Sequence, residues 1–221
     1  YPALGEAPRT LSNQTTGTNI YLSEQTAVVD VDTGDFRVLN VNPVNWASIG
    51  EDSGVVKVTD GCHAGWYFDL TQTRERVISP VTIRGGKAII ITSIPSNTAC
   101  STKAGDSVLM ALDACTGSSP TAPVLDTPTE TDDVTGELVA DGQLTDADLV
   151  DIDGDGVGDY APGMKINDMI YSPAILSMGD GERDMAYFGK ARPGAGSGDS
   201  PVESVVMTGL RRGMYFWREM D

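Results

Sequence analysis

Four aspartates lie close together in the stretch DIDGDGVGD at 151–159. Calcium takes about six to eight oxygen ligands at roughly 2.3–2.6 Å, and a tightly turned loop offers them from its positions 1, 3, 5, 7 and 9. The predicted ligands of a calcium ion are therefore the carboxylates of Asp151, Asp153, Asp155 and Asp159 and the backbone carbonyl of Val157. Calcium is the only cofactor that the sequence predicts.

Three glycines separate these aspartates, at positions 154, 156 and 158. Glycine adopts positive φ without a steric penalty, so these residues are expected to bend the chain around one ion. In a helix-loop-helix calcium site a bidentate Glu closes the loop at position 12, but Pro162 stands there. A calcium loop between strands is therefore expected, with a further ligand from elsewhere or from water. A solvated Asp-Gly turn is the alternative, but it leaves the repulsion among four nearby carboxylates unexplained.

The charge is strongly negative and unevenly placed. The net charge is −17, and 14 of the 32 acidic residues lie between Lys103 and Lys165, where no basic residue occurs. Nucleic acids and anionic lipids are poor partners for such a chain because phosphate binding relies on Lys and Arg. An acidic insertion that holds a cation explains the distribution better than a general need for solubility.

The composition is that of a folded protein. Hydrophobic residues make up 40% and charged residues 21% of the 221 residues, which excludes global disorder. No apolar run reaches the roughly 20 residues that span a bilayer, so no membrane insertion is expected. The first residues carry no signal-peptide pattern, and Tyr1 is expected to be a processed or truncated start.

The elements that must position the acidic loop are predicted to be β-strands. Apolar segments at 27–31 and 36–41 flank an Asp-Thr-Gly-Asp turn, which indicates a hairpin. A second hairpin is predicted from 76–83 and 88–94 around the turn at 84–87. Its second arm is almost entirely β-branched and should be buried on both faces.

Further short strands complete an all-β pattern, with a single short helix expected at 145–150, just before the acidic loop. The predicted strands lie at 55–58, 65–70, 108–113, 169–176, 185–188, 202–207 and 214–217. A strand that ends in Asp and is followed by a Thr-Gly turn recurs about 80 residues apart, as in propeller blades. About eleven strands are too few to close a propeller, so the expected fold is a partial propeller of antiparallel blades.

The same pattern gives the predicted domain organisation. Residues 1–24 are a leader or connection, 25–117 form propeller-type blades, 118–163 are the acidic insertion with the calcium loop, and 164–221 are closing strands. Open sheet edges in such a fragment invite self-association.

Three cysteines leave one thiol over if a disulfide forms. Cys100 and Cys115 flank the predicted strand at 108–113 and are the disulfide candidates, which leaves Cys62. An extracellular setting agrees with calcium at millimolar concentration and with a disulfide.

Five segments in order resemble the C-terminal region of the PilY-type adhesins, β-propeller proteins associated with the tip of type IV pili. The segments are GWYFDL at 65–70, RERV at 74–77, IIITSIP at 89–95 with Cys100, the run ending LDACTG at 109–117, and MYFWRE at 214–219. The resemblance covers roughly 25–117 and 164–221. Members of this family are longer, so the chain is expected to be the C-terminal part of a larger protein or a reduced relative.

The resemblance implies a secreted bacterial protein at the cell surface or pilus tip. Its implied roles are adhesion, twitching motility, and the extension and retraction of the pilus (fimbrium). Its implied partners are other pilus-tip or minor pilin subunits and a host or abiotic surface. The family has a calcium loop of the DxDxDG type that regulates pilus function, and 151–159 fits that pattern.

Other chemistry is weakly indicated, and the chain is not expected to be an enzyme. His63 is the single histidine and, beside Cys62 and Asp60, lacks the further imidazoles of a transition-metal site. No pair of acids is singled out for a glycoside hydrolase. Trp46, Trp66 and Trp217 allow a carbohydrate-stacking face, although strand spacing favours core positions. The alternative function is a secreted, calcium-stabilised structural or filament-forming subunit without a pilus role.

Overall fold

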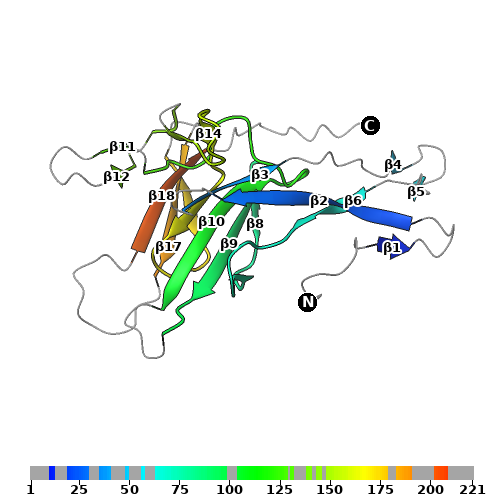
Figure 1. Cartoon of the computed structure of the whole chain (residues 1–221), viewed down its shortest axis with the longest axis horizontal. Helices are drawn as coiled ribbons and strands as arrows, with labels where there is room; N and C mark the ends of the chain where they lie inside the picture. The colour runs from blue at the N-terminus through cyan, green and yellow to red at the C-terminus, as the bar shows by residue number, and fades with distance from the viewer. Residues whose placement is uncertain are drawn as a thin grey trace, which may run out of the picture.

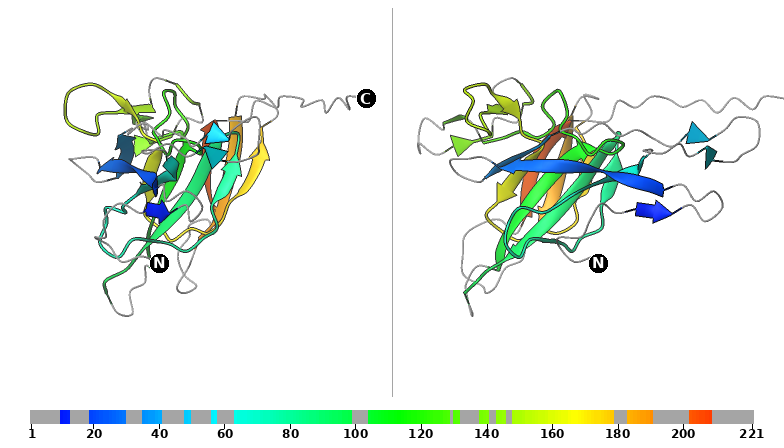
Figure 2. Two further views of the ribbon diagram at one scale, coloured as in Figure 1. Left: turned by 90° about the vertical axis from the view of Figure 1, so that its right-hand side faces the viewer. Right: turned by 45° about the vertical axis from the view of Figure 1, so that its right-hand side comes forward.

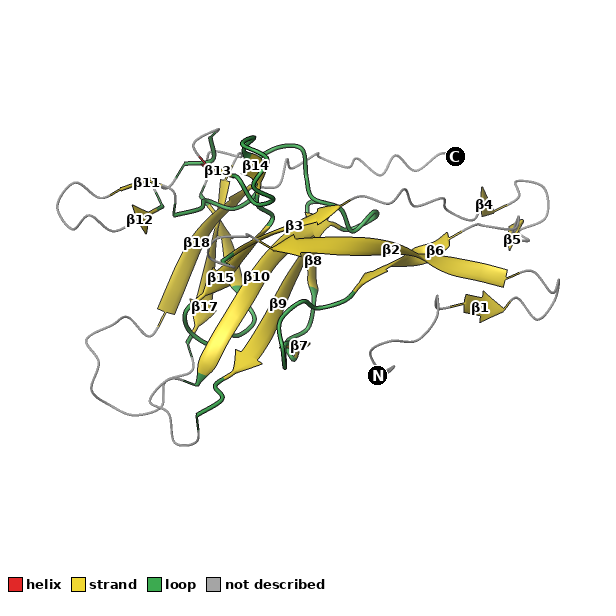
Figure 3. Ribbon diagram, in the orientation of Figure 1, coloured by secondary structure: helices red, strands yellow, loops and turns green. Residues whose placement is uncertain are grey.

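The computed structural model describes the chain in segments and contains β-strands joined by turns (Figure 3). The described residues are 10–12, 19–29, 35–40, 48–49, 56–57, 63–98, 104–128, 130–131, 138–140, 143–145, 148–178, 183–190 and 202–208. Within these residues, no helix has the length and hydropathy needed to cross a bilayer. The all-β, mainly antiparallel class expected from the sequence is confirmed.

A long hairpin of β9 (Lys87–Pro95) and β10 (Gly105–Asp113) occupies the centre of the structure (Figure 1). The two strands pair along their whole length, from Gly105 with Pro95 to Asp113 with Lys87. Ile89 and Leu109 belong to one hydrophobic cluster, and their neighbours Ile90 and Met110 belong to a second cluster on the opposite face. The prediction that the 88–94 arm is buried on both faces is therefore confirmed.

The hairpin belongs to a large sheet in the order β1-β2-β3-β15-β10-β9-β7, with β6 on β2 and β8 on β9. The further strands are β1 (Thr10–Ser12), β2 (Asn19–Val29), β3 (Phe36–Asn40), β6 (His63–Phe68), β7 (Arg76–Val77), β8 (Thr82–Arg84) and β15 (Gly163–Ile166). β2 and β3 form the predicted first hairpin. β6 runs parallel to β2, whereas the other pairs are antiparallel.

A smaller sheet packs on one face of β9 and β10 (Figure 2). It contains β16 (Ala174–Ser177), β17 (Arg183–Gly189) and β18 (Val202–Thr208) in that order. Phe188 and Ala186 of β17 are fully buried and join Leu109 and Ile91 in one cluster. The core of the protein therefore lies between two stacked sheets.

The opposite face of β9 and β10 is covered by aromatic side chains of β6. Trp66 and Phe68 pack against the cluster of Ile90, Met110 and Leu112. Gly117 lies against Trp66, because a Cβ there would stand 2.2 Å from an indole carbon. Its positive φ of 70° also favours glycine, so the turn after β10 is built around the tryptophan ring.

The turn between β8 and β9 is formed by Gly85 and Gly86, with φ values of 56° and 75°. Positive φ at both central residues is the type I′ geometry of two-residue hairpins, so the predicted turn at 84–87 is confirmed. The first arm of this hairpin is broken between β7 and β8, where Pro80 cannot donate to a ladder. Arg84 of β8 crosses to the smaller sheet, with its Nε 3.0 Å from Asp184 Oδ2.

A buried ion pair ties β3 to the loop before β7. Arg37 Nη1 lies 2.6 Å from Glu75 Oε1, and both side chains are almost fully buried. Thr92 Oγ1 donates to the same carboxylate oxygen, and the backbone N–H of Gln72 donates to the other. Arg37 lies beside Gly163 on β15, where an added Cβ would approach Arg37 Cβ to 3.2 Å. Glycine at 163 thus makes room for the arginine.

Short strand pairs surround the two sheets. They are β4 (Ser48–Ile49) with β5 (Val56–Lys57), β11 (Glu130–Thr131) with β12 (Leu138–Val139), and β13 (Leu149–Val150) with β14 (Asp159–Tyr160). The helix expected at 145–150 is wrong at its C-terminal end, because 149–150 form β13. The predicted strand at 214–217 lies outside the described residues.

The assignment of these strands to propeller blades stays a prediction, as do the domain boundaries. Most of the described strands form the two packed sheets, and β15 spans the predicted boundary between the insertion and the closing strands. β15 pairs with both β10 and β3, so the end of the acidic insertion is joined directly to the large sheet.

Candidate metal centre

The acidic loop is closed by the two-stranded pair of β13 and β14. Leu149 pairs with Tyr160 and Val150 with Asp159, so residues 151–158 form the connection between them. Ile152 is the one residue of 151–158 whose side chain is fully buried. This isoleucine anchors the loop to the protein while its acidic neighbours remain in solvent.

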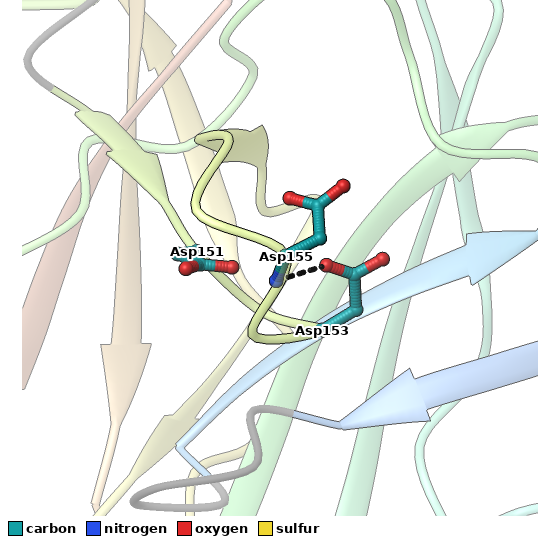
Figure 4. A group of neighbouring side chains, drawn as sticks. All are labelled: Asp151, Asp153 and Asp155. Atoms are coloured by element: carbon teal, nitrogen blue, oxygen red, sulfur yellow. Dashed lines mark hydrogen bonds between the residues drawn. The ribbon is translucent and has the colours of Figure 1, made fainter.

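Three of the predicted ligands come together in the structure. Asp151, Asp153 and Asp155 each offer a carboxylate oxygen, and these oxygens lie within 4.8 Å of one another. All three side chains are exposed and project from one turn of the chain (Figure 4). The alternate spacing therefore brings three of the five predicted ligands together, and their role as metal ligands stays a prediction.

Backbone N–H groups of the loop donate to the same carboxylates. Asp151 accepts from Gly154 N at 2.9 Å and from Gly156 N at 3.0 Å. Asp153 Oδ1 accepts from Asp155 N at 3.2 Å, and Asp155 Oδ1 accepts from Val157 N at 2.7 Å. These bonds hold the side chains over a curled backbone and leave further carboxylate lone pairs for a cation.

Two of the three glycines have the conformation that was expected. Gly154 and Gly156 have φ values of 78° and 85°, which only glycine adopts freely. Gly158 is needed for a different reason, because a Cβ at this position would stand 2.8 Å from Leu149 Cβ. Its small size lets the loop return close to β13.

Asp159 lies outside the group of three. It belongs to β14, and its Oδ2 accepts a long hydrogen bond of 3.4 Å from Ile152 N. Partial burial raises the pKa of Asp159, the charges of Asp153, Asp155 and Asp151 raise it further, and the bond from Ile152 opposes both effects. In the metal-free protein, ionised Asp159 therefore lowers the free energy of unfolding at pH values above its raised pKa. This destabilisation is lost as the pH falls through that pKa and the carboxylate is protonated.

Val157 lies two residues before the start of β14. Its side chain is 64% exposed, so it contributes no core contact there. Its backbone N–H bonds to Asp155, as described above, while a role for its carbonyl as a ligand stays a prediction.

A buried aspartate that sequence reasoning did not select anchors the base of the loop. Asp148 Oδ1 accepts from Thr127 N at 2.8 Å and from Thr127 Oγ1 at 3.2 Å, and Thr127 Oγ1 also lies 3.1 Å from the Asp148 carbonyl. Asp148 Oδ2 accepts from Thr145 N at 2.8 Å, and Asp148 N donates to the Thr145 carbonyl. The bond from Thr145 N to the Asp148 carboxylate is the half of a capping box that the Thr-x-x-Asp spacing signals, whereas Asp148 N bonds to the backbone carbonyl of Thr145 and closes a turn.

The donor set determines which ions this cluster can hold. Carboxylate oxygens favour hard divalent cations, and no sulfur or imidazole ligand accompanies them within the described part of the loop. Three formal negative charges in an exposed turn leave several coordination positions open to water. An aspartate triad of this kind can hold a metal ion.

Of the other residues singled out in the sequence, those that the structure describes lie outside this cluster. Cys115 is exposed in the turn after β10, and its predicted partner Cys100 lies outside the described residues, as does Cys62. The disulfide therefore stays a prediction. His63 is the first residue of β6.

Trp66 is a structural residue. Its ring stacks on Phe68 with centroids 6.1 Å apart, and its Nε1 donates to the carbonyl of Ala114 at 3.1 Å. This packing agrees with the core position favoured by strand spacing. Trp46 and Trp217, which were considered with it for a carbohydrate-stacking face, lie outside the described residues.

Comparisons of the chain with protein families, with curated proteins and with solved structures give no match.

Proposed function

We propose that this chain is a calcium-binding protein of the bacterial cell surface that acts at the tip of the type IV pilus. In this proposal it serves adhesion and the extension and retraction of the pilus, and it has no catalytic activity. The adhesion and pilus roles rest on the resemblance of the strand motifs to the PilY-type adhesins. The propeller assignment belongs to the same proposal.

One observation supports the calcium part of the proposal most directly. The carboxylates of Asp151, Asp153 and Asp155 are gathered within 4.8 Å in a loop whose own N–H groups orient them. Bringing three like charges together costs free energy, which a divalent cation offsets. An all-oxygen donor set in an extracellular protein makes calcium the expected ion.

The proposed mechanism is that calcium orders the acidic insertion at 118–163. With the ion bound, the carboxylates are neutralised and the loop is rigid, whereas without it they repel one another and the segment opens. The hydrogen bonds between Asp148 and Thr127 connect the base of the loop to the chain that leaves β10. Through these hydrogen bonds, binding or loss of the ion would alter the surface of the insertion that partners contact.

Calorimetric titration of chelator-stripped protein with calcium tests the site. We expect one saturable site in the wild type, and its loss in Asp153→Ala. Asp69→Ala is the matched control, because Asp69 is an exposed aspartate outside the loop. Equal binding by the wild type and Asp153→Ala would exclude this loop as the site.

The pilus role has its own test in the source bacterium. Replacing the native copy with Asp153→Ala should reduce twitching motility and surface attachment, while Asp69→Ala should leave both intact. Unchanged motility and attachment in Asp153→Ala, with calcium binding already lost in vitro, would refute calcium regulation of the pilus.

The alternative, a secreted filament-forming subunit, is supported by the open edge of the large sheet. Four large aliphatic residues are exposed along β7, β8 and the segment between them: Val77, Ile78, Val81 and Ile83. Exposed apolar edge strands pair readily with other chains. Electron micrographs of the purified protein discriminate the two functions, since filaments support the alternative and discrete particles support the pilus-tip protein.

A further inference from the structure

The smaller sheet ends in a strand whose outer edge is only partly paired. β18 pairs with β17 on one side and forms the edge of the sheet on the other (Figure 3). On the outer side, Leu125 forms an isolated bridge with Met207, and Asp126 N donates to the Val206 carbonyl at 3.0 Å. The outer edge of β18 therefore accepts a further strand, and the chain around Leu125 already pairs with its C-terminal end.

This short pairing stops for an identifiable reason. In the same antiparallel register Pro128 would stand opposite Ser204, but proline has no N–H to donate. Thr127 N donates instead to Asp148 Oδ1 at 2.8 Å, so the chain turns away from β18. Hydrogen bonds alternate along an antiparallel strand, so the N–H and C=O of Ser204 point to the same side as the Val206 carbonyl. Among the described strands, none pairs with Ser204 on that side.

A groove of about 500 Å³ lies along this edge. Its lining includes Ser204, Val205 and Val206, three consecutive residues whose side chains alternate between the two faces of the sheet. A space that touches neighbours from both faces lies beside the edge of the strand and not over either face. Pro128 and Lys190 also line it. The groove therefore follows the part of β18 where the pairing with 124–126 has ended.

The hydrophobic core is least covered beside this groove. Met164, Ile166 and Val205 line the groove and belong to the cluster between the two sheets. Their side chains are 8%, 8% and 7% exposed, whereas no other buried member of that cluster exceeds 4%. A fourth strand beside β18 would place alternate side chains next to these three residues and remove the remaining apolar surface from water.

The charge of the protein favours a basic partner. With a net charge of −17, the chain attracts cationic segments and repels acidic ones. Two lysines line the groove, but Lys165 Nζ lies 3.3 Å from Asp35 Oδ1 and Lys190 Nζ lies 3.2 Å from Asp168 Oδ2. Each lysine is thus matched by an aspartate, and the groove presents no excess of positive charge to a basic segment.

We propose that an extended, basic segment of a partner protein binds in this groove and adds to β18 as a fourth strand of the smaller sheet. Its backbone pairs with Ser204, its apolar side chains at alternate positions cover Met164, Ile166 and Val205, and its lysines or arginines face solvent. Strand addition of this kind takes its affinity from main-chain hydrogen bonds and its specificity from the sites for alternate side chains. The proposal rests neither on calcium binding nor on the pilus role.

Three peptides test the proposal by NMR titration of the isotopically labelled protein. Acetyl-KVTVKVT-amide has the proposed alternation and charge, and a second version with every internal backbone nitrogen methylated cannot pair as a strand. Acetyl-EVTVEVT-amide keeps the alternation and reverses the charge. We expect shifts at Ser204, Val205 and Ile166, with affinity about tenfold lower for the methylated and for the acidic peptide.

A proline substitution tests the edge itself. Ser204→Pro removes the outward N–H and leaves the ladder to β17 intact, so it should weaken binding of the basic peptide about tenfold. Ser177→Pro, at the opposite edge of the same sheet, is the matched control. Met178 N donates to the Arg183 carbonyl at 3.1 Å, so by the same alternation the N–H of Ser177 also points away from β17. This variant should bind the peptide as the wild type does.

Several results would overturn the proposal. Absence of shifts along β18, shifts confined to β7 and β8, equal affinity for the methylated peptide, or unchanged affinity in folded Ser204→Pro would each do so. If Ser204→Pro does not fold, the methylated peptide decides alone. Equal affinity for the acidic peptide would refute a basic partner. Cross-strand nuclear Overhauser effects from Ser204 to the same chain, or to a second copy in a mixed-label sample, would show that this protein fills the groove itself and would refute a separate partner.

Discussion

The β9–β10 hairpin and the acidic loop are stabilised in opposite ways. The hairpin has aliphatic side chains on both faces and lies between two hydrophobic clusters. The loop has exposed carboxylates held by its own backbone N–H groups, and Ile152 is its fully buried side chain. Most of the folding free energy therefore comes from the hairpin side chains, whereas cation binding depends on the loop carboxylates. Substitutions in one region should have little effect on the property that depends on the other.

The largest expected effect is on the hairpin. Leu109→Ala removes a fully buried side chain from the cluster between the sheets and should lower the free energy of unfolding by about 2–5 kcal/mol. The matched substitution Leu176→Ala, at a residue that is 59% exposed, should change it by no more than about 0.5 kcal/mol. Denaturant unfolding of both variants measures the difference, and similar losses would contradict the proposed location of the core.

The next effect concerns the stabilisation that calcium provides. A ligand that binds only the folded state at 100 times its dissociation constant stabilises it by about 2.7 kcal/mol. We expect the wild type and Asp69→Ala to show a calcium-dependent rise in melting temperature that Asp153→Ala lacks. Without calcium, Asp153→Ala should melt at the same temperature as the other two proteins or slightly higher, because Asp153 is exposed and its removal relieves repulsion among the aspartates. A large drop for calcium-free Asp153→Ala would show that the loop carries folding free energy.

The connection between the two regions can be weakened at Thr127. Thr127→Val keeps the shape of the side chain but removes the hydroxyl that bonds to Asp148. The free energy of unfolding should fall by about 1–2 kcal/mol, because a buried acceptor loses a partner. Calcium affinity should also fall, because Asp148 lies three residues before Asp151 and would hold the start of the loop less firmly. Thr73→Val, at an exposed threonine, is the control, and unchanged calcium affinity in Thr127→Val would separate the metal loop from this anchor.

The smallest effect is a pH dependence at the end of the hairpin. Partial burial acts to raise the pKa of Asp113, but hydrogen bonds from Thr116 and Cys115 and the charge of Lys87 lower it overall. A carboxylate with a depressed folded-state pKa contributes stability above its unfolded pKa of about 3.9, and this contribution is lost as the pH falls through the folded value.

Acid titrations of unfolding measure that contribution. Asp113→Asn should be slightly less stable than the wild type at neutral pH, and the difference should shrink as the pH falls through the lowered folded-state pKa and the wild-type carboxyl is protonated. Asp69→Asn serves as the control. A constant difference across the whole range would mean that the charge of Asp113 has no part in its effect.

The sequence predicts the elements whose side chains carry local patterns. The β-branched run of β9 and the Gly85-Gly86 turn depend on residues near one another in the chain, and both are confirmed. The alternate aspartates are equally local, and three of them form a group that could hold a metal ion. Gly158 was expected to provide positive φ, whereas it provides close packing against Leu149. That contact depends on how the hairpin closes, which the glycine spacing does not specify.

Long-range pairings were not predictable in the same way. The buried pair of Arg37 and Glu75 joins residues 38 positions apart, and neither lies in a pattern that suggests burial. The parallel pairing of β6 with β2 also lacks a local signal. At the metal site, the anchor formed by Thr127 and Asp148 depends on contacts across the insertion, so only its capping-box half was accessible from the sequence.

The position of β15 has a consequence for the order of folding. This strand lies between β3 and β10, although it follows them in the chain and comes directly after the metal loop. During synthesis the large sheet therefore cannot be completed until the acidic loop and β15 have left the ribosome. Pairing β15 with β3 also closes a long loop, and such late contacts slow folding. Because the closure cost grows only slowly with loop length, an ion bound at 151–159 should stabilise the folded sheet without much change in the rate at which β15 pairs.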